Sequence, residues 1–199
     1  MKKNIWDERY NQEDYVYGIK PNSFFAEHLK KMPPGKIILP CEGEGRNAVF
    51  AASNGWLVDA FDTSEVGKQK ALKLAEKKGV SITYLIGDAN SIIFPSNEYD
   101  VVAFIYAHFP EEIRKNIHQR AINWLKPGGK VILEAFHPNQ LKNNSGGPKN
   151  EAMLYTEAML TDDFKGLELE LLKTTQTILN EGKFHEGTAD IIRFIGVKK

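Results

Sequence analysis

The chain has few of the features that mark extracellular, metal-binding or membrane-spanning proteins. Its 199 residues include one cysteine, Cys41, which excludes an intrachain disulfide and a cysteine-based zinc cluster. The longest apolar run, 101–107, is far shorter than the roughly 20 residues that a membrane span needs. The first residues are not followed by the apolar stretch of a secretion signal. We therefore expect a soluble, cytoplasmic protein without a metal site.

An excess of charge of either sign is also missing. The chain has 26 lysine and arginine residues and 26 aspartate and glutamate residues. Proteins that bind nucleic acids or anionic membranes normally carry a basic excess, so neither is an expected partner. The hydrophobic share of 42% and the aromatic share of 11% are those of a folded chain. The length suits one domain with a full core.

Short apolar strands alternate with amphipathic helices from residue 36 onward. Strands are expected at 36–39, 57–61, 82–86, 101–106 and 130–136, and helices at 46–54, 64–78 and 110–125. This α/β alternation predicts a parallel sheet with right-handed crossovers and helices on both faces. An antiparallel hairpin is expected from strands at 167–179 and 184–197.

The other segments frame this core within a single domain, residues 1–199. Residues 1–35 are expected to form a helical cap, in which the aromatic and charged stretch 6–17 is either a flap over a site or a cover for a sheet edge. Residues 36–136 form the cofactor-binding core and 137–150 a mobile loop that acts as a lid. Residues 151–199 form a helix, capped by Thr161-Asp162-Asp163, and the hairpin.

The strongest local signal is the turn between the first strand and its helix, Cys41-Glu42-Gly43-Glu44-Gly45-Arg46-Asn47-Ala48. It fits the dinucleotide-binding fingerprint, in which glycines let the backbone approach a ligand and an acidic residue, here Asp62, accepts the ribose hydroxyls. Glu42 and Glu44 stand where NAD would place its pyrophosphate, and each opposes a dianion by about 1 kcal/mol at 4 Å in water. Both suit a ligand with an ammonium and a sulfonium group, which favours S-adenosylmethionine.

The chain resembles class I S-adenosylmethionine-dependent methyltransferases, most closely their tellurite-resistance and thiopurine-methyltransferase branch. Besides the glycine turn and Asp62, the resemblance is carried by Trp6-Asp7-Glu8-Arg9-Tyr10, Tyr17-Gly18-x-x-Pro21-Asn22, Gly87-Asp88-Ala89, Leu125-Lys126-Pro127-Gly128-Gly129, Glu134-Ala135-Phe136-His137-Pro138, Gly146-Gly147-Pro148-Lys149 and Glu181-Gly182-x-x-His185-x-Gly187. It covers almost the whole chain. It implies a Rossmann-like, mostly parallel sheet of seven strands in the order 3-2-1-4-5-7-6, with the hairpin at its antiparallel end.

The resemblance also implies the cofactor site. The backbone near Gly43 and Gly45 is expected to hold the methionine part of S-adenosyl-L-methionine, Asp62 the ribose, and Asp88 with Ala89 the adenine, with S-adenosyl-L-homocysteine as the product. The full expected set is Glu42, Gly43, Gly45, Arg46, Asn47, Asp62, Thr63, Asp88, Ala89 and Tyr106. The first motif departs from the wider family at Leu39, Pro40, Cys41 and Glu42, where many relatives have an acidic residue and a glycine.

The acceptor side carries fewer signals. Methyl transfer from a sulfonium is an in-line displacement, so a base is needed only when the nucleophile arrives protonated. His108, after the fourth strand, is the candidate base, and its alternative role is to cap or pack against a neighbouring helix. Tyr17, His137 and His185 are candidate acceptor-binding residues.

The expected function is methyl transfer to a small-molecule acceptor, by a monomer or homodimer. A thiol or other chalcogen nucleophile is implied by the resemblance alone. The alternatives are an NAD-type oxidoreductase, indicated by Gly43-x-Gly45-x-x-Ala48, and a non-catalytic nucleoside-binding protein on the same fold.

Overall fold

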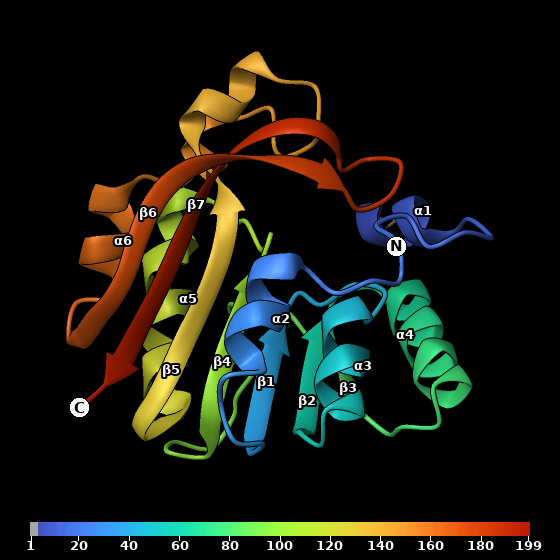
Figure 1. The fold of residues 1–199 in the computed structure, drawn as a ribbon, viewed down its shortest axis with the longest axis horizontal. Coiled ribbons are helices and arrows are strands. Elements are labelled where there is room, and N and C mark those ends of the chain that lie inside the picture. The colour runs from blue at the N-terminus through green and yellow to red at the C-terminus, as the bar shows by residue number, and fades with distance from the viewer. Residues whose placement is uncertain (1–3) are drawn as a thin grey trace.

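A seven-stranded sheet runs through the computed structural model, which describes residues 4–199 (Figure 1). The strands are β1 (Lys36–Pro40), β2 (Leu57–Asp62), β3 (Thr83–Ile86), β4 (Tyr99–Ile105), β5 (Leu125–Phe136), β6 (Leu167–Asn180) and β7 (Glu186–Lys198). Their order is β3-β2-β1-β4-β5-β7-β6, in which β1 to β5 are parallel and β7 is antiparallel to both its neighbours. The predicted Rossmann-like fold, its strand order and its antiparallel hairpin are confirmed.

The helices are α1 (Ile5–Tyr10), α2 (Ser23–Leu29), α3 (Arg46–Ser53), α4 (Glu65–Lys77), α5 (Glu111–Trp124) and α6 (Glu157–Asp163), with short 3-10 turns η1 (Pro138–Lys142) and η2 (Glu151–Met153). Side-chain caps fix several of their starts. The Asn22 side chain accepts the N–H of Phe25 at α2, and the Ser64 hydroxyl accepts the N–H of Gly67 at α4. The chain therefore enters each of these helices at a residue that the sequence marks.

Two hydrophobic layers cover the two faces of the sheet. Because successive strand residues point to opposite faces, Ile37 packs with Phe25 in the layer of α2 and α3, whereas Ile38 packs with Ile117 in the layer of α5 and α6. All four of these side chains are completely buried. The central parallel strands thus expose no face to solvent, as their continuous apolar sequences predict.

Two local predictions were wrong. Thr161-Asp162-Asp163 does not cap the short helix but ends it, because the Thr156 side chain caps α6 by accepting the N–H of Met159. The Thr161 hydroxyl instead donates back to the carbonyl of Glu157, at 2.8 Å. The fifth strand begins at Leu125 rather than Lys130, and a register shift lies opposite it in β4.

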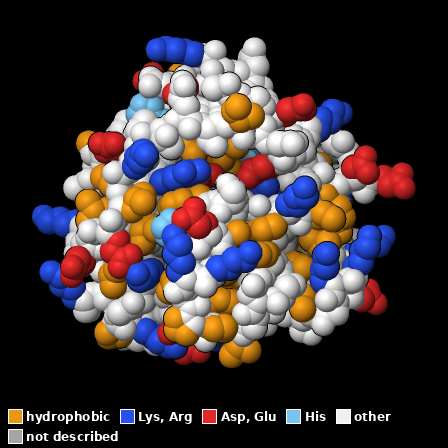
Figure 2. Space-filling view, in the orientation of Figure 1, with side chains coloured by type: hydrophobic (Ala, Val, Ile, Leu, Met, Phe, Trp, Pro, Cys, Tyr) orange, Lys and Arg blue, Asp and Glu red, His pale blue; other side chains and the backbone are white. Residues whose placement is uncertain are grey.

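Charged side chains of both signs are interspersed over the face shown in Figure 2, in keeping with the equal numbers of acidic and basic residues. Within residues 4–199, no helix has the length and apolar character needed to cross a membrane.

Candidate active site

A cavity of about 700 Å³ opens at the carboxyl ends of β1, β2 and β4. The strand order reverses between β1 and β4, and ligands of open α/β sheets bind in the crevice beyond such a point. The backbone turns sharply there, because Cys41 after β1 and Tyr106 after β4 have φ values of 55° and 54°. Left-handed backbone at non-glycine residues is strained, and such strain concentrates at functional sites.

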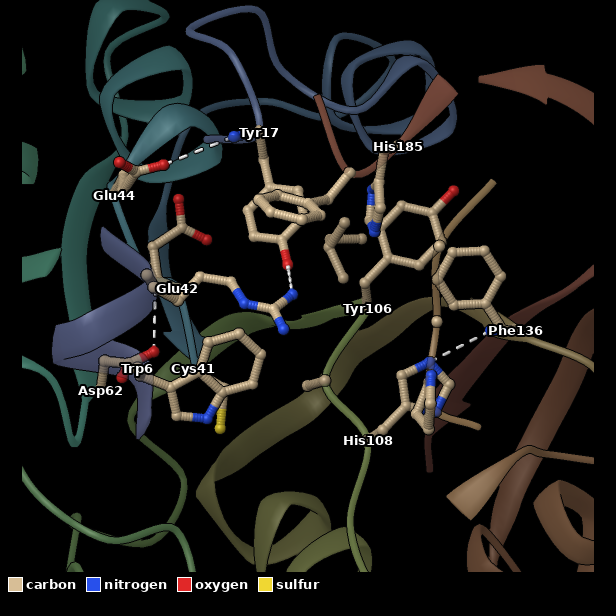
Figure 3. Close-up of a pocket in the computed structure, with 18 of the residues that line it drawn as sticks. Trp6, Tyr17, Cys41, Glu42, Glu44, Asp62, Tyr106, His108, Phe136 and His185 are labelled. Atoms are coloured by element: carbon tan, nitrogen blue, oxygen red, sulfur yellow. Dashed lines mark hydrogen bonds between the residues drawn. The ribbon is translucent and has the colours of Figure 1, made fainter. Parts of the chain in front are cut away.

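The cavity brings most of the predicted residues together. It is lined by Tyr17, Glu42, Gly43, Arg46, Asn47, Asp62, Thr63, Asp88, Ala89, Tyr106, His108 and His185. Glu42 and Asp62 lie on one side of it, and His108, Phe136 and His185 on the other (Figure 3). Gly45 and His137 do not line it. His137 instead caps η1, where its ring accepts the N–H of Asn139 at 3.2 Å.

The two glycines of the turn allow helices α4 and α1 to pack closely against it. A Cβ on Gly45 would come within 2.5 Å of the Cβ of Ala71 in α4, and one on Gly43 would come within 2.5 Å of the Tyr10 hydroxyl. Both glycines also have positive φ values, 85° and 59°. Glycine at these positions is therefore required by the close contact of the turn with α4 and α1, in addition to the predicted approach of a ligand.

Asp62 fixes the shape of the turn. Its Oδ2 accepts the N–H of Gly43 and its Oδ1 the N–H of Ser64, both at 3.0 Å, while the Tyr84 hydroxyl donates to the Gly43 carbonyl at 2.6 Å. Burial raises the pKa of the Asp62 carboxyl, although these backbone N–H groups oppose the effect. Each carboxylate oxygen has a further lone pair for a hydroxyl in the cavity.

Glu42, one of the four residues of the variant first motif, caps α3. Its Oε1 accepts the backbone N–H groups of Asn47 and Ala48, both at 2.8 Å. Burial raises the pKa of this carboxyl to about 7, against the opposing effect of those N–H donors. The side chain thus satisfies helix-terminal donors while remaining in the cavity wall.

Glu44 attaches the N-terminal segment to the turn. Its carboxylate pairs with Lys70 of α4 at 2.5 Å and accepts the N–H of Val16 at 2.8 Å. Trp6, Arg9 and Tyr17 on either side of this attachment line the cavity. Residues 6–17 therefore form part of the cavity wall, and their role as a flap stays a prediction. The charge of Glu44 is already balanced by Lys70.

Four aromatic rings pack together in the cavity, three of which, those of Tyr106, Phe136 and His185, lie across it from Glu42 and Asp62 (Figure 3). The His185 ring lies 4.5 Å from that of Tyr17 and 4.6 Å from that of Tyr106, which stacks on Phe136 at 4.7 Å. Behind this wall, Glu134 at the end of β5 accepts the Tyr106 hydroxyl at 2.8 Å. The wall is therefore held by a buried carboxylate as well as by ring packing.

Glu181 orients His185. The Glu181 carboxylate accepts Arg46 at 2.9 Å and lies 3.4 Å from Nδ1 of His185. Burial opposes ionisation of Glu181, but the His185 hydrogen bond and the Arg46 charge lower its pKa to about 2. Burial also lowers the pKa of His185, which favours the neutral ring, and the Glu181 carboxylate beside Nδ1 favours the tautomer with its proton on that nitrogen. Within residues 4–199, Nε2 has no hydrogen-bond partner.

His108 has a different arrangement. Its Nδ1 lies 2.6 Å from the Met153 carbonyl, and its Nε2 accepts the N–H of Phe136 at 3.2 Å. Burial lowers its pKa to about 4. Both ring nitrogens are thus engaged by the backbone, which favours the packing role. Its role as a base stays a prediction.

Comparison with known proteins bears on this site. Residues 39–129 match the family model described as a methyltransferase domain. The phosphoethanolamine N-methyltransferase of Triticum aestivum is 23% identical over 87% of the chain, and the chain spans about a third of that relative, 32% of its length.

Solved structures share the fold across nearly the whole chain. TehB from Haemophilus influenzae has a TM-score of 0.74 at 18% identity, covering 98% of this chain and 66% of that one. A structure from work on the conversion of a disulfide bond into a thioacetal group during echinomycin biosynthesis has a TM-score of 0.78 at 14% identity, covering 97% and 88%. A S-adenosylmethionine-dependent methyltransferase of Methanosarcina mazei has a TM-score of 0.66 at 18% identity, covering 90% and 98%. The chain thus contains a match to a methyltransferase domain over residues 39–129, and it shares the fold of these solved structures along almost its whole length.

Proposed function

We propose that the protein transfers a methyl group from S-adenosylmethionine to a small molecule with a soft nucleophile, a thiol or another chalcogen. The observation that carries the proposal is one cavity with two unlike walls. Carboxylates at the ends of β1 and β2 form one wall, and an aromatic cluster with an oriented histidine forms the other.

The carboxylate wall fits the cofactor that the family implies. Asp62 has free lone pairs for the ribose hydroxyls, and Glu42 presents a half-buried carboxyl near the turn that would hold the methionine part. Asp88 and Ala89 after β3 would hold the adenine. When bound, S-adenosylmethionine supplies a methyl group whose bond to the cationic sulfur breaks with the electron pair left on sulfur.

The aromatic wall fits the acceptor. Tyr17, Tyr106 and His185 surround the space where a nucleophile would meet the methyl group, and aromatic faces favour a nearby cation by about 0.5–2 kcal/mol. An acceptor that arrives protonated would give its proton to Nε2 of His185, while Glu181 stabilises the resulting charge. Positioning between the two walls supplies the remaining acceleration.

Sulfur as the acceptor atom is supported by the family branch and by the sulfur chemistry of the structure with the TM-score of 0.78. An amine acceptor is the second candidate, because the wheat relative acts on phosphoethanolamine nitrogen by its name. His185 serves both, since an ammonium acceptor also has to lose a proton.

Calorimetric titration with S-adenosylhomocysteine, with NAD as the control, tests the cofactor. We expect binding at micromolar affinity or tighter, about −8 kcal/mol, and no binding of NAD. Turnover against thiols and amines of matched size then separates the two acceptor classes. Absence of S-adenosylhomocysteine binding by the folded protein would overturn the proposal.

A further inference from the structure

The cavity is lined by charged side chains of both signs. Its carboxylates include Glu42, Asp62 and Asp88. Three cations also line it, Arg9 of α1, Lys149 of the loop before η2 and Lys183 of the β6–β7 turn, and together they are called its basic end. Arg9 and Lys183 lie over the same ring, that of Phe184.

The three cations are also without acidic partners. Arg9 donates to the Tyr17 hydroxyl at 3.1 Å and lies 4.8 Å over the ring of Phe184, and Lys149 donates to a backbone carbonyl at 3.1 Å. Lys183 lies 5.8 Å over the Phe184 ring. Across residues 4–199, none of the three has a carboxylate oxygen within 4.0 Å. Arg46, in contrast, is neutralised by Glu181 at 2.9 Å.

This basic end is close to the reacting region. Arg9 contacts the hydroxyl of Tyr17, and the Tyr17 ring lies 4.5 Å from the His185 ring. A single aromatic side chain therefore separates a free guanidinium from the oriented histidine. A small molecule with a nucleophile at one end and a charge at the other can reach both.

We infer that the methyl acceptor carries an oxyanion group, a carboxylate or a phosphate, separate from its nucleophilic atom. Arg9, Lys149 and Lys183 bind this group while the nucleophile lies beside His185. A guanidinium can bind either a carboxylate or a phosphate through two parallel N–H donors, and each lysine ammonium adds a further positive charge that attracts the anion. This inference rests on the proposed function and narrows its acceptor. The basic end also attracts such molecules to the cavity from solution.

Non-reactive probes test the inference independently of the nucleophile. Protein saturated with S-adenosylhomocysteine is titrated with benzoate, phenyl phosphate and benzamide, which share a ring and differ in charge. We expect the preferred anion to bind about tenfold tighter than benzamide at low salt, with an advantage that shrinks as salt is added. Comparison of benzoate with phenyl phosphate identifies which oxyanion the site prefers.

Charge-removing variants assign the preference to these residues. Lys149→Gln and Lys183→Gln are each expected to weaken anion binding about threefold and to leave benzamide unchanged. Adding Arg9→Gln to both removes the preference, and retained S-adenosylhomocysteine binding shows that this triple variant is folded. Lys142→Gln is the matched control, because Lys142 is exposed in the same loop but does not line the cavity.

Equal affinity for benzamide and both anions would overturn the inference alone. So would an equal effect of Lys142→Gln and Lys149→Gln. Failure to bind S-adenosylhomocysteine in the same instrument would overturn the proposed function, and with it this inference.

Discussion

Replacing Gly45 by alanine tests whether the glycine turn is shaped by its contact with α4. The new methyl group would lie 2.5 Å from Cβ and 2.8 Å from Cα of Ala71. Because one of these atoms is backbone, the contact cannot be relieved by a side-chain rotation. Overpacking of this kind costs about 1–3 kcal/mol, and the left-handed φ of 85° costs a non-glycine residue about 1–2 kcal/mol more. The expected loss in the free energy of unfolding is therefore about 2–5 kcal/mol.

Gly79→Ala is the matched control. Gly79 has a φ of 67°, and a Cβ there would meet nothing within 4 Å, so only the backbone cost of about 1–2 kcal/mol remains. The free energies of unfolding of the two variants, measured with urea, separate the backbone cost from the cost of the contact with Ala71. This comparison holds because both substitutions restrict the unfolded chain equally.

A second substitution isolates the contact itself. Ala71→Gly removes the methyl group that Gly45→Ala would meet, at a helix-propensity cost of about 1 kcal/mol. In that background, Gly45→Ala is expected to cost at least about 1 kcal/mol less than in the native chain. The reasoning fails if the two costs are equal, or if Gly45→Ala is no more harmful than Gly79→Ala.

Further changes probe the site directly. Asp62→Ala is expected to weaken S-adenosylhomocysteine binding by about 1–3 kcal/mol, measured by calorimetry, and unchanged affinity would contradict the ribose contact. His185→Asn is expected to lower kcat/KM for protonated acceptors by about 10²-fold, and kcat/KM should recover at a pH that ionises the acceptor. If it does not recover there, His185 does not act as the base. His108→Asn is expected to keep kcat/KM within a few-fold while lowering Tm, and the opposite pattern would restore it as the base. Because burial raises the pKa of Glu42 to about 7, above its ordinary 4.5, the protonated form stabilises the fold at low pH. This contribution to the free energy of unfolding, about 3 kcal/mol at most, is lost as the pH rises from 4.5 through about 7. Glu42→Gln should remove this pH dependence when the free energy of unfolding is measured with urea across that range.

The fold could be predicted because its signals are local and repeated. Each central strand is a short apolar run, and each helix begins or ends at a residue with a known conformational preference, such as Ser64 or Gly79. Once the strands are parallel, their carboxyl ends meet at one edge, so residues as distant as Glu42, Asp62 and Tyr106 are expected in one cavity.

The partners of the charged residues could not be predicted in the same way. Glu42 and Glu44 both follow β1, yet one caps a helix and the other pairs with Lys70 of α4. Their sequence spacing is equally compatible with two carboxylates that both face a ligand. Which partner each carboxylate takes depends on where α4 and Val16 pack, and the spacing does not determine this. The sequence pattern does not indicate Glu134 as the support of Tyr106, although Glu134 lies near the end of β5 at the same edge of the sheet.

The histidines show the same limit. His108 and His185 both follow or precede strands that reach the cavity, and only the surrounding donors distinguish them. Two backbone groups occupy the ring of His108, whereas a carboxylate occupies one side of His185. Such contacts are made by η2 and the β6–β7 turn, whose path the sequence pattern does not determine.

The contact between Asn22 and Glu181, which lie 159 positions apart in the chain and 3.3 Å apart in space, has a consequence for how the protein matures during synthesis. The parallel strands β1 to β5 can be made and paired before the β6–β7 turn has been translated. The carboxylate wall and three rings of the aromatic wall therefore exist in the growing chain well before His185 completes the cavity. A chain stopped between residues 136 and 180 would have the residues proposed to hold the cofactor and would lack Glu181 and His185, the pair proposed to accept a proton from the acceptor.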